Sequence, residues 1–199
     1  MAVRQAAVAD RRIVTKSDIA SADRLARLVD RLQAINPGAT LTFVNHGETD
    51  ANELLTSIAF DPYDERLQLD AWFDPGRYRR GQRLGHAAGT EQYHFSSEVA
   101  IRSWLLESDG PLDWSILSDR LAQIVGRYGD VILRMKGLIF TAGDDHPLVL
   151  HAMQRLFHPP MRLATVRASS VSSMVIIGDS RAEPAANELK AAMIDASHR

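Results

Sequence analysis

The stretch Ile13-Val14-Thr15-Lys16-Ser17-Asp18 joins a short apolar run to a helix that is predicted to start at Ser21. Residues 12–15 are predicted to form a strand, because consecutive apolar residues are typical of a buried parallel strand. Apolar residues then recur at helical spacing as far as Asn36-Pro37-Gly38, which predicts the end of the helix. Another strand is expected at residues 40–44. The order strand, helix, strand predicts a βαβ unit with a right-handed crossover.

Thr15-Lys16-Ser17-Asp18 resembles the guanine-reading motif of P-loop GTPases, Asn/Thr-Lys-x-Asp. A carboxylate at the last position can accept two hydrogen bonds from the N1–H and the exocyclic amine of guanine, and the lysine stem can cover the base. Adenine offers no such pair of donors. The alternative interpretation of Lys16 and Asp18 is an exposed turn at a helix start, where the macrodipole favours aspartate. Within this motif we predict guanine contacts from Thr15, Lys16 and Asp18.

Asn45-His46-Gly47 follows the second strand, where GTPases place a loop whose backbone lies against the guanine. A simple turn is the alternative interpretation, and we add His46 and Gly47 to the predicted guanine contacts. No Gly-x-x-x-x-Gly-Lys-Ser/Thr phosphate loop occurs in the sequence. Phosphoryl transfer depends on groups that cradle the β and γ phosphates, so the sequence leaves open whether this chain hydrolyses GTP.

Residues 61–93 have a different composition, with two Asp-Pro steps, four glycines and few large apolar side chains. We predict a flexible linker there, because little apolar surface is available to offset the ordering entropy. The linker separates a first unit at 1–60 from a second unit at 94–199. A basic run in the linker lacks the interleaved aromatics of a base-stacking platform, so nucleic-acid binding is not expected. This run consists of Arg77, Arg79, Arg80 and Arg83.

The second unit is predicted to form an α+β sandwich, a mostly antiparallel sheet with helices on one side. Its helix is capped by Asp113 and ends at Gly129, for which a left-handed conformation is expected. The inward face of that helix comprises Trp114, Leu117, Leu121, Ile124 and Tyr128. Strands are expected at 98–106, 131–140, 148–157 and 173–177, with a hairpin loop at Gly143-Asp144-Asp145 and a closing helix from about residue 184.

Composition limits the possible functions. The sequence contains no cysteine, which excludes disulfides and thiolate metal sites within this chain and leaves His, Asp and Glu as metal ligands. The net charge of −2 gives no general attraction to nucleic acid or to an anionic membrane. No apolar run reaches the length of a membrane helix and no signal peptide is evident, so a cytoplasmic location is expected.

The ordered set of motifs resembles the C-terminal portion of the CobW-type GTPases, a family of GTP-dependent metal chaperones. The segments that carry the resemblance are Ala9-Asp10-Arg11, Ile13-Val14-Thr15-Lys16-Ser17-Asp18, Ile35-Asn36-Pro37, Phe60-Asp61-Pro62, Pro111-Leu112-Asp113-Trp114, Leu133-Arg134-Met135-Lys136-Gly137 and the run from Leu150 to Pro160. The resemblance implies a fold in which the C-terminal half of a P-loop GTPase domain precedes a CobW C-terminal domain. The family's phosphate loop, magnesium-contacting residues and Cys-x-Cys-Cys metal motif have no counterpart in this sequence.

The resemblance also implies a function. A complete family member binds GTP and magnesium, hydrolyses GTP and hands zinc or cobalt to a client metalloprotein, and the C-terminal domain is expected to contact clients or other copies of the chain. Many relatives carry a histidine-rich linker, so His86 and His94 are the candidate metal ligands, with solvated linker residues as the favoured alternative. His151 and His158, beside a strand, are expected to be hydrogen-bonded structural residues. A non-enzymatic interaction module that has lost nucleotide binding is the alternative function.

The first unit has a further physical consequence. Half of a Rossmann-like sheet leaves an unpaired strand edge and an uncovered apolar face, which favours dimerisation, strand swapping or disorder. A homo-oligomer is therefore among the expected partners.

Overall fold

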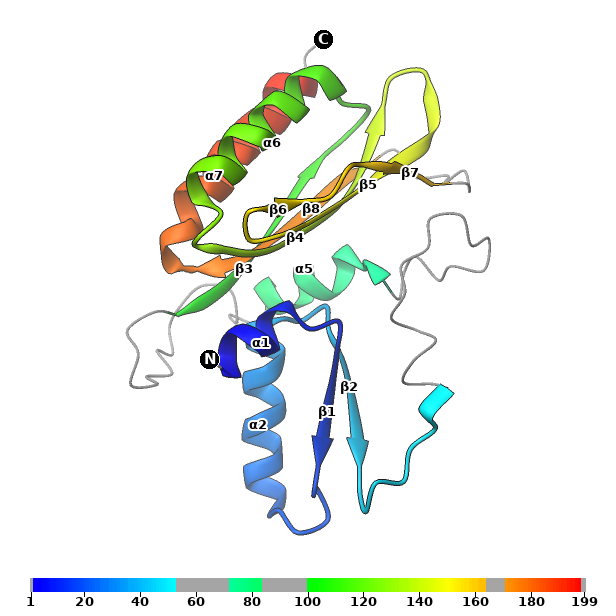
Figure 1. Ribbon diagram of the computed structural model, residues 1–199, viewed down its shortest axis with the longest axis vertical. Coiled ribbons are helices and arrows are strands. Elements are labelled where there is room, and N and C mark those ends of the chain that lie inside the picture. The colour runs from blue at the N-terminus through cyan, green and yellow to red at the C-terminus, as the bar shows by residue number, and fades with distance from the viewer. Residues whose placement is uncertain (1, 53–71, 84–99, 164–170, 198–199) are drawn as a thin grey trace.

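The computed structural model of the chain describes residues 2–52, 72–83, 100–163 and 171–197. Figure 1 shows an N-terminal unit in the lower half of the view and a larger sheet with two long helices in the upper half. This mixed α/β architecture, with a mostly antiparallel second sheet, confirms the predicted fold class. Within the described residues, none of the helices combines the length and the apolar character that crossing a membrane requires.

The N-terminal unit contains the predicted βαβ arrangement. Its elements are α1 (Ala2–Val8), β1 (Arg11–Thr15), α2 (Ala22–Ile35) and β2 (Thr40–Val44). The two strands run parallel, with Arg11 opposite Thr40 and Thr15 opposite Val44. Ser21 occupies the N-cap position of α2 in an extended conformation, but its side chain makes no capping hydrogen bond.

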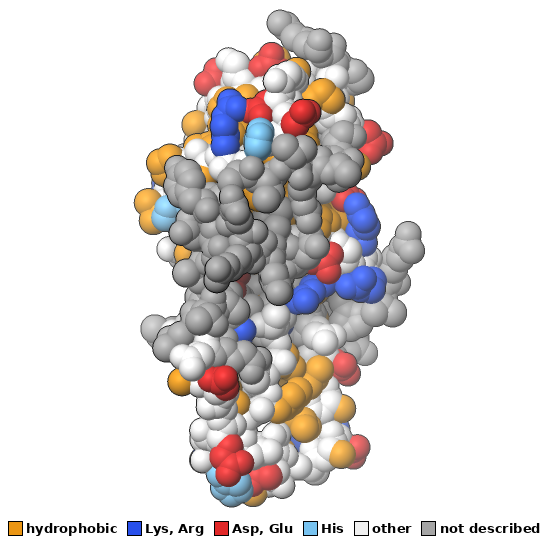
Figure 2. All heavy atoms as spheres, turned by 90° about the vertical axis from the view of Figure 1, so that its right-hand side faces the viewer, with side chains coloured by type: hydrophobic (Ala, Val, Ile, Leu, Met, Phe, Trp, Pro, Cys, Tyr) orange, Lys and Arg blue, Asp and Glu red, His pale blue; other side chains and the backbone are white. Residues whose placement is uncertain are grey.

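Apolar side chains of this unit remain on its surface, as the sequence predicted for half of a sheet. The exposed large hydrophobic residues of the unit are Ile13, Ile19, Leu28 and Phe43. Figure 2 shows hydrophobic side chains gathered on the lower part of the molecule, where Figure 1 places this unit. An exposed apolar surface of this kind is typical of an interaction site.

Asn36 connects the N-terminal unit to the segment that follows it. Its side-chain amide is buried and donates to the carbonyl oxygens of Ala7 (2.9 Å) and Ala9 (3.1 Å). Its Oδ1 accepts hydrogen bonds from the hydroxyl of Tyr78 (3.2 Å) and the backbone N–H of Gly38 (3.1 Å). A buried amide whose donors and acceptor are all satisfied fixes the relative positions of the segments that it bonds.

The expectation of an unstructured linker is wrong for Pro75–Arg83, which form α5. Proline suits the first helical position, and Asp74 accepts a hydrogen bond from the backbone N–H of Gly76 (2.8 Å) as an N-cap residue does. Phe73 and Tyr78 are buried in a core shared with both flanking units. Composition alone missed this segment because two buried aromatic side chains are enough to anchor it.

The C-terminal domain is a six-stranded antiparallel sheet in the order β3-β8-β4-β5-β6, with β7 paired to β5. Its elements are β3 (Ile101–Ser108), α6 (Trp114–Tyr128), β4 (Ile132–Thr141), β5 (Asp144–Met153), β6 (Leu156–Phe157), β7 (Met161–Arg162), β8 (Ser172–Asp179), the 3-10 turn η1 (Ser180–Ala182) and α7 (Glu183–Ser197). The sequence predicted the long strands and both helices to within a few residues, but it merged β6 with β5.

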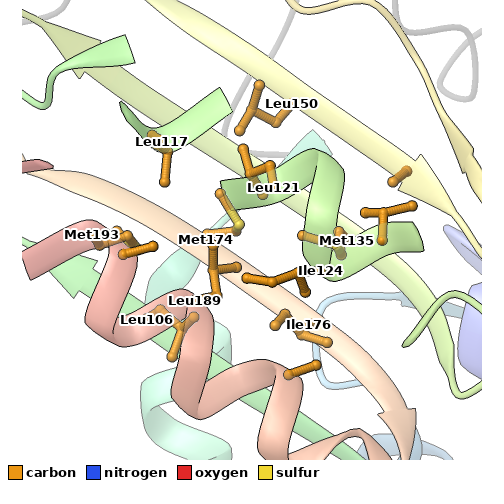
Figure 3. Packing of buried hydrophobic residues seen from close by; sticks show 14 of the residues in the cluster. Leu106, Leu117, Leu121, Ile124, Met135, Leu150, Met174, Ile176, Leu189 and Met193 are labelled. Atoms are coloured by element: carbon orange, nitrogen blue, oxygen red, sulfur yellow. The ribbon is translucent and has the colours of Figure 1, made fainter. Parts of the chain in front are cut away.

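Both faces of this sheet are covered. Helices α6 and α7 pack on one face, where Leu121, Ile124 and Leu189 meet residues of β4 and β8 (Figure 3). The opposite face packs against Ala7 of α1 and against Phe73 and Tyr78. Figure 1 shows α1 and α5 below the sheet, so α1 of the N-terminal unit and the α5 segment cover the face that α6 and α7 leave free.

The two ends of α6 differ in how well the sequence predicted them. Asp113 caps the helix as predicted and accepts hydrogen bonds from the backbone N–H groups of Ser115 (2.8 Å) and Ile116 (3.2 Å). The left-handed conformation expected at Gly129 is wrong, because its φ is −59° and its ψ −19°. A Cβ at this position would lie 2.6 Å from the Arg155 side chain, so glycine is required there for space rather than for backbone freedom.

Candidate functional site

Two loops form the candidate site, one after β1 and one after β2. The carboxyl ends of neighbouring parallel strands meet at one edge of a sheet, where α/β proteins commonly bind ligands. Figure 1 places this edge at the lower end of the molecule. Asn45 joins the loops: its Oδ1 accepts hydrogen bonds from the Ser17 hydroxyl (2.7 Å) and from the Asp18 backbone N–H (3.2 Å). The structure therefore brings all five predicted guanine-contacting residues into two linked loops.

The backbone of these loops adopts conformations that most residues avoid. Lys16 has a φ of 59° and His46 a φ of 55°, and Gly47 follows with a φ of 78°. Left-handed conformations are uncommon for residues with a side chain, and such strain concentrates at functional sites. The hydrogen bonds of Asn45 therefore help to hold the loops in a conformation that the backbones of Lys16 and His46 do not favour by themselves.

The Asp18 carboxylate is the candidate acceptor for a bound base. Its Oδ2 lies 3.4 Å from Nε2 of His46, and the Asp18 side chain is 32% exposed. Two carboxylate oxygens at an open sheet edge match the paired N1–H and amine donors of guanine. The His46 imidazole is also exposed and contacts the same carboxylate, so a base bound to Asp18 would replace this contact.

Asn45 is the residue of the candidate site that the sequence did not single out. It lies in the predicted turn, but local pattern gives no indication that its side chain reaches the other loop. We predict that Asn45→Ala removes both hydrogen bonds of the link, each with a usual net value of about 1 kcal/mol. Amide hydrogen exchange at Asp18 should then be ~5-fold faster. The Glu48 amide, which donates to the Asn45 backbone carbonyl (3.0 Å), is the internal control.

The two candidate metal ligands, His86 and His94, lie outside the described residues. Within 2–52, 72–83, 100–163 and 171–197, no group of three or more His, Cys, Asp or Glu side chains is arranged to hold a metal ion. The metal assignment thus stays a prediction.

A second charged cluster connects the N-terminal unit to the C-terminal domain. Asp10 precedes β1, whereas Arg134 and Lys136 lie on β4 with side chains only 4% and 6% exposed. One guanidinium nitrogen of Arg134 lies 2.7 and 2.6 Å from the two carboxylate oxygens of Asp10, and the Lys136 ammonium donates to the same group. Arg134 also donates to the Val8 carbonyl. Lys136 donates to the Trp72 carbonyl (2.8 Å) and lies 4.5 Å from the centroid of its ring.

In this cluster, burial and the neighbouring opposite charge shift the pKa of each group in opposite directions. Burial raises the pKa of Asp10, but the charges of Lys136 and Arg134 and their hydrogen bonds outweigh it, so the pKa lies below its ordinary value. Burial and the neighbouring Arg134 lower the pKa of Lys136 to about 8, although Asp10 acts against both. The carboxylate is therefore the group that makes two buried cations tolerable.

His151 lies opposite Lys136 on β5, and its ring stacks on that of His158 with centroids 5.2 Å apart. The expectation of a hydrogen-bonded structural histidine is not met by its side chain, because Nε2 is buried without a partner among the described residues. Burial lowers the pKa of His151 to about 4, and the charges of Arg134, Lys136 and His158 add to this while Asp10 opposes it.

This shift predicts a pH-dependent stability. The folded-state pKa is lower than the ordinary value of 6.5, so the unfolded chain binds more protons between about pH 4 and 6.5. The contribution of a neutral His151 to the free energy of unfolding is therefore fully present above pH 6.5 and is lost as the pH falls toward 4. We predict that His151→Gln flattens the pH dependence of the free energy of unfolding in this window, measured by urea denaturation. An unchanged pH dependence in the variant would contradict this assignment.

The fold and both clusters define the class of protein: a half-sheet of two parallel strands joined to an α+β domain. Comparison with known proteins agrees. Residues 101–194 match the family model described as the cobalamin synthesis protein cobW C-terminal domain. The curated zinc chaperone YjiA of Escherichia coli (strain K12) is 27% identical over 174 residues, which span 87% of this chain and 48% of the relative.

Two solved structures share the fold. They are the Zn(II)-bound YjiA GTPase from E. coli and a Zn(II)-bound triple mutant of the YjiA GTPase, each with a TM-score of 0.65, 24% sequence identity and coverage of 98% of this chain and 54% of the other. The chain thus spans about half the length of the relatives that it matches. Residues 101–194 thus form a domain of the cobW C-terminal type, and the chain as a whole is similar to part of these relatives.

Proposed function

We propose that this chain is the guanine-reading and client-binding part of a CobW-like, GTP-dependent metal chaperone. The observation that carries the proposal is the pair of loops linked by Asn45, which presents the Asp18 carboxylate at the carboxyl edge of a parallel sheet. In this proposal Asp18 accepts from the guanine base, Lys16 covers it, and Thr15, His46 and Gly47 shape the pocket around it. The relative's description as a zinc chaperone supports zinc as the cargo, with cobalt as the alternative metal.

The proposal assigns only the guanine contacts to this chain, because the sequence contains no phosphate loop. The triphosphate and magnesium require groups that these residues do not supply. The proposed division places the GTPase part in residues 1–60 and the CobW C-terminal domain in 94–199, with a client or a second copy bound through the latter. The contact between these two parts includes Trp72, Phe73 and Tyr78. A cytoplasmic location goes with such a role.

The proposal is tested with a chimera in which this chain replaces the matching C-terminal half of the E. coli relative. That relative would supply the residues that precede the matched region. We expect the chimera to bind GTP in preference to ATP and to hydrolyse it. Its bound zinc should pass to a chromogenic zinc probe at a rate that GTP changes. A folded chimera that binds GTP and ATP equally would refute the guanine assignment, and nucleotide-independent zinc release would refute the chaperone role.

A further inference from the structure

A hollow of about 590 Å³ lies between α1 and the C-terminal domain, away from the guanine loops. Three arginines from different elements line it: Arg4 of α1, Arg155 of the turn between β5 and β6, and Arg181 of η1. The apolar side chains of Met153 and Leu156 line the same hollow. In Figure 1, α1, η1 and the β5–β6 turn lie on the left of the view.

The hollow carries more positive than negative charge at its base. Asp179 is completely buried, and its carboxylate accepts from the Arg181 guanidinium at 3.1 and 2.6 Å. Arg4 lies 3.9 Å from the same carboxylate. Two cations therefore share one buried anion, and both guanidinium groups remain largely exposed. Their outer N–H groups are held in place and are free to meet a second carboxylate.

Two apolar side chains on a constrained backbone also line the hollow. Leu156 is 61% exposed, and Met153 is exposed as well, although both flank a tight turn of the domain. Gln154 between them has a φ of 53°, and its backbone N–H donates to the Leu133 carbonyl (3.3 Å). The turn therefore presents two apolar side chains from a constrained backbone, which reduces the entropy that a ligand must overcome.

We propose that this hollow binds a protein segment that carries a carboxylate next to an apolar side chain. The carboxylate bonds to Arg4 and Arg181, and the apolar side chain packs on Met153 and Leu156. A polyphosphate or nucleic acid fits less well, because Asp130 neutralises Arg155 (2.7 and 2.5 Å) and Asp179 neutralises part of the charge of Arg4 and Arg181, which leaves enough positive charge for one carboxylate and not for several phosphates. The inference rests on the proposed client contact, and it specifies where the client binds and which side chains of the client are recognised.

The test is a selection of random peptides displayed on phage against the immobilised full chain, without GTP and without zinc. We expect the selected peptides to share an acidic residue adjacent to a leucine, phenylalanine or methionine. Arg4→Ala and Leu156→Ser should each weaken the binding of a selected peptide by ~10-fold, because each removes one half of the recognition. Arg127→Ala is the matched control, since this exposed arginine on α6 is also ion-paired, to Glu188.

Three results would overturn the inference: selected peptides without a carboxylate, a failure to select any peptide, or equal binding by the two variants and the control. Displacement of the peptide by inorganic tripolyphosphate as effectively as by a competing acidic peptide would assign the hollow to phosphate-bearing ligands instead. Circular dichroism of the variants shows that they are folded, and neither variant removes the Arg181 partner of Asp179. Because nucleotide and zinc are absent, the outcome is independent of whether the chimera binds GTP.

Discussion

Replacing Asp10 by alanine is expected to lower the free energy of unfolding by about 3 kcal/mol, the lower end of the cost of breaking a buried ion pair. The variant leaves Arg134 and Lys136 buried without their shared carboxylate. Asp10 itself is partly exposed, which places the cost at the lower end of that range. Urea denaturation measures the loss. Amide exchange in α1 should rise with it, because Arg134 also holds the Val8 carbonyl.

Asp130→Ala is the matched control for this prediction. Asp130 also bonds to one arginine through both carboxylate oxygens, but both partners are exposed. Surface pairs contribute little, so the control should lose far less stability than the Asp10→Ala variant. Equal losses in the two variants would mean that the Asp10 cluster does not hold the N-terminal unit against the C-terminal domain.

Asp18→Asn is expected to reduce the affinity of the chimera for GTP by roughly 100-fold, since one hydrogen bond from guanine is lost and the other no longer has a charged acceptor. Affinity for XTP should rise, because xanthine carries a carbonyl where guanine carries its amine and the asparagine amide can donate to it. Competition of both nucleotides against a fluorescent GTP analogue measures the two affinities.

The control variant is Asp50→Asn, which changes a nearby carboxylate that bonds only to the Asn52 backbone among the contacts described (2.8 Å). It should leave the ratio of GTP to XTP affinity unchanged. An Asp18→Asn variant with the same ratio as the unmodified chimera would show that Asp18 does not read the base.

Local sequence features predicted the local structure well. The bounds of β2 agree residue for residue, the Asp113 cap of α6 makes both expected hydrogen bonds, and the buried face of that helix follows its spacing. Each of these depends on residues within a few positions of one another, where periodicity and capping rules apply. The placement of the five residues proposed to contact guanine, at the carboxyl ends of two adjacent strands, followed equally from the parallel pairing.

Contacts between distant segments could not be predicted in this way. Asp10 and Arg134 are 124 positions apart and belong to separate motifs of the sequence, so neither motif indicates that the two side chains meet. The same applies to Asn36, whose amide reaches both α1 and Tyr78. The linker prediction was wrong at α5 for this reason: composition counts apolar residues along the chain, whereas Phe73 and Tyr78 are stabilised by a sheet formed far away in sequence.

The central claim, that the two linked loops read guanine, is tested most directly by nuclear magnetic resonance of the nitrogen-15-labelled chain titrated with guanosine and, separately, with adenosine. Nucleosides need no phosphate site, so the measurement isolates base recognition. The account predicts that guanosine shifts the amide signals of residues 15–18 and 45–47 and that adenosine does not. Equal shifts with both nucleosides, or no guanosine shifts in these loops, would contradict it.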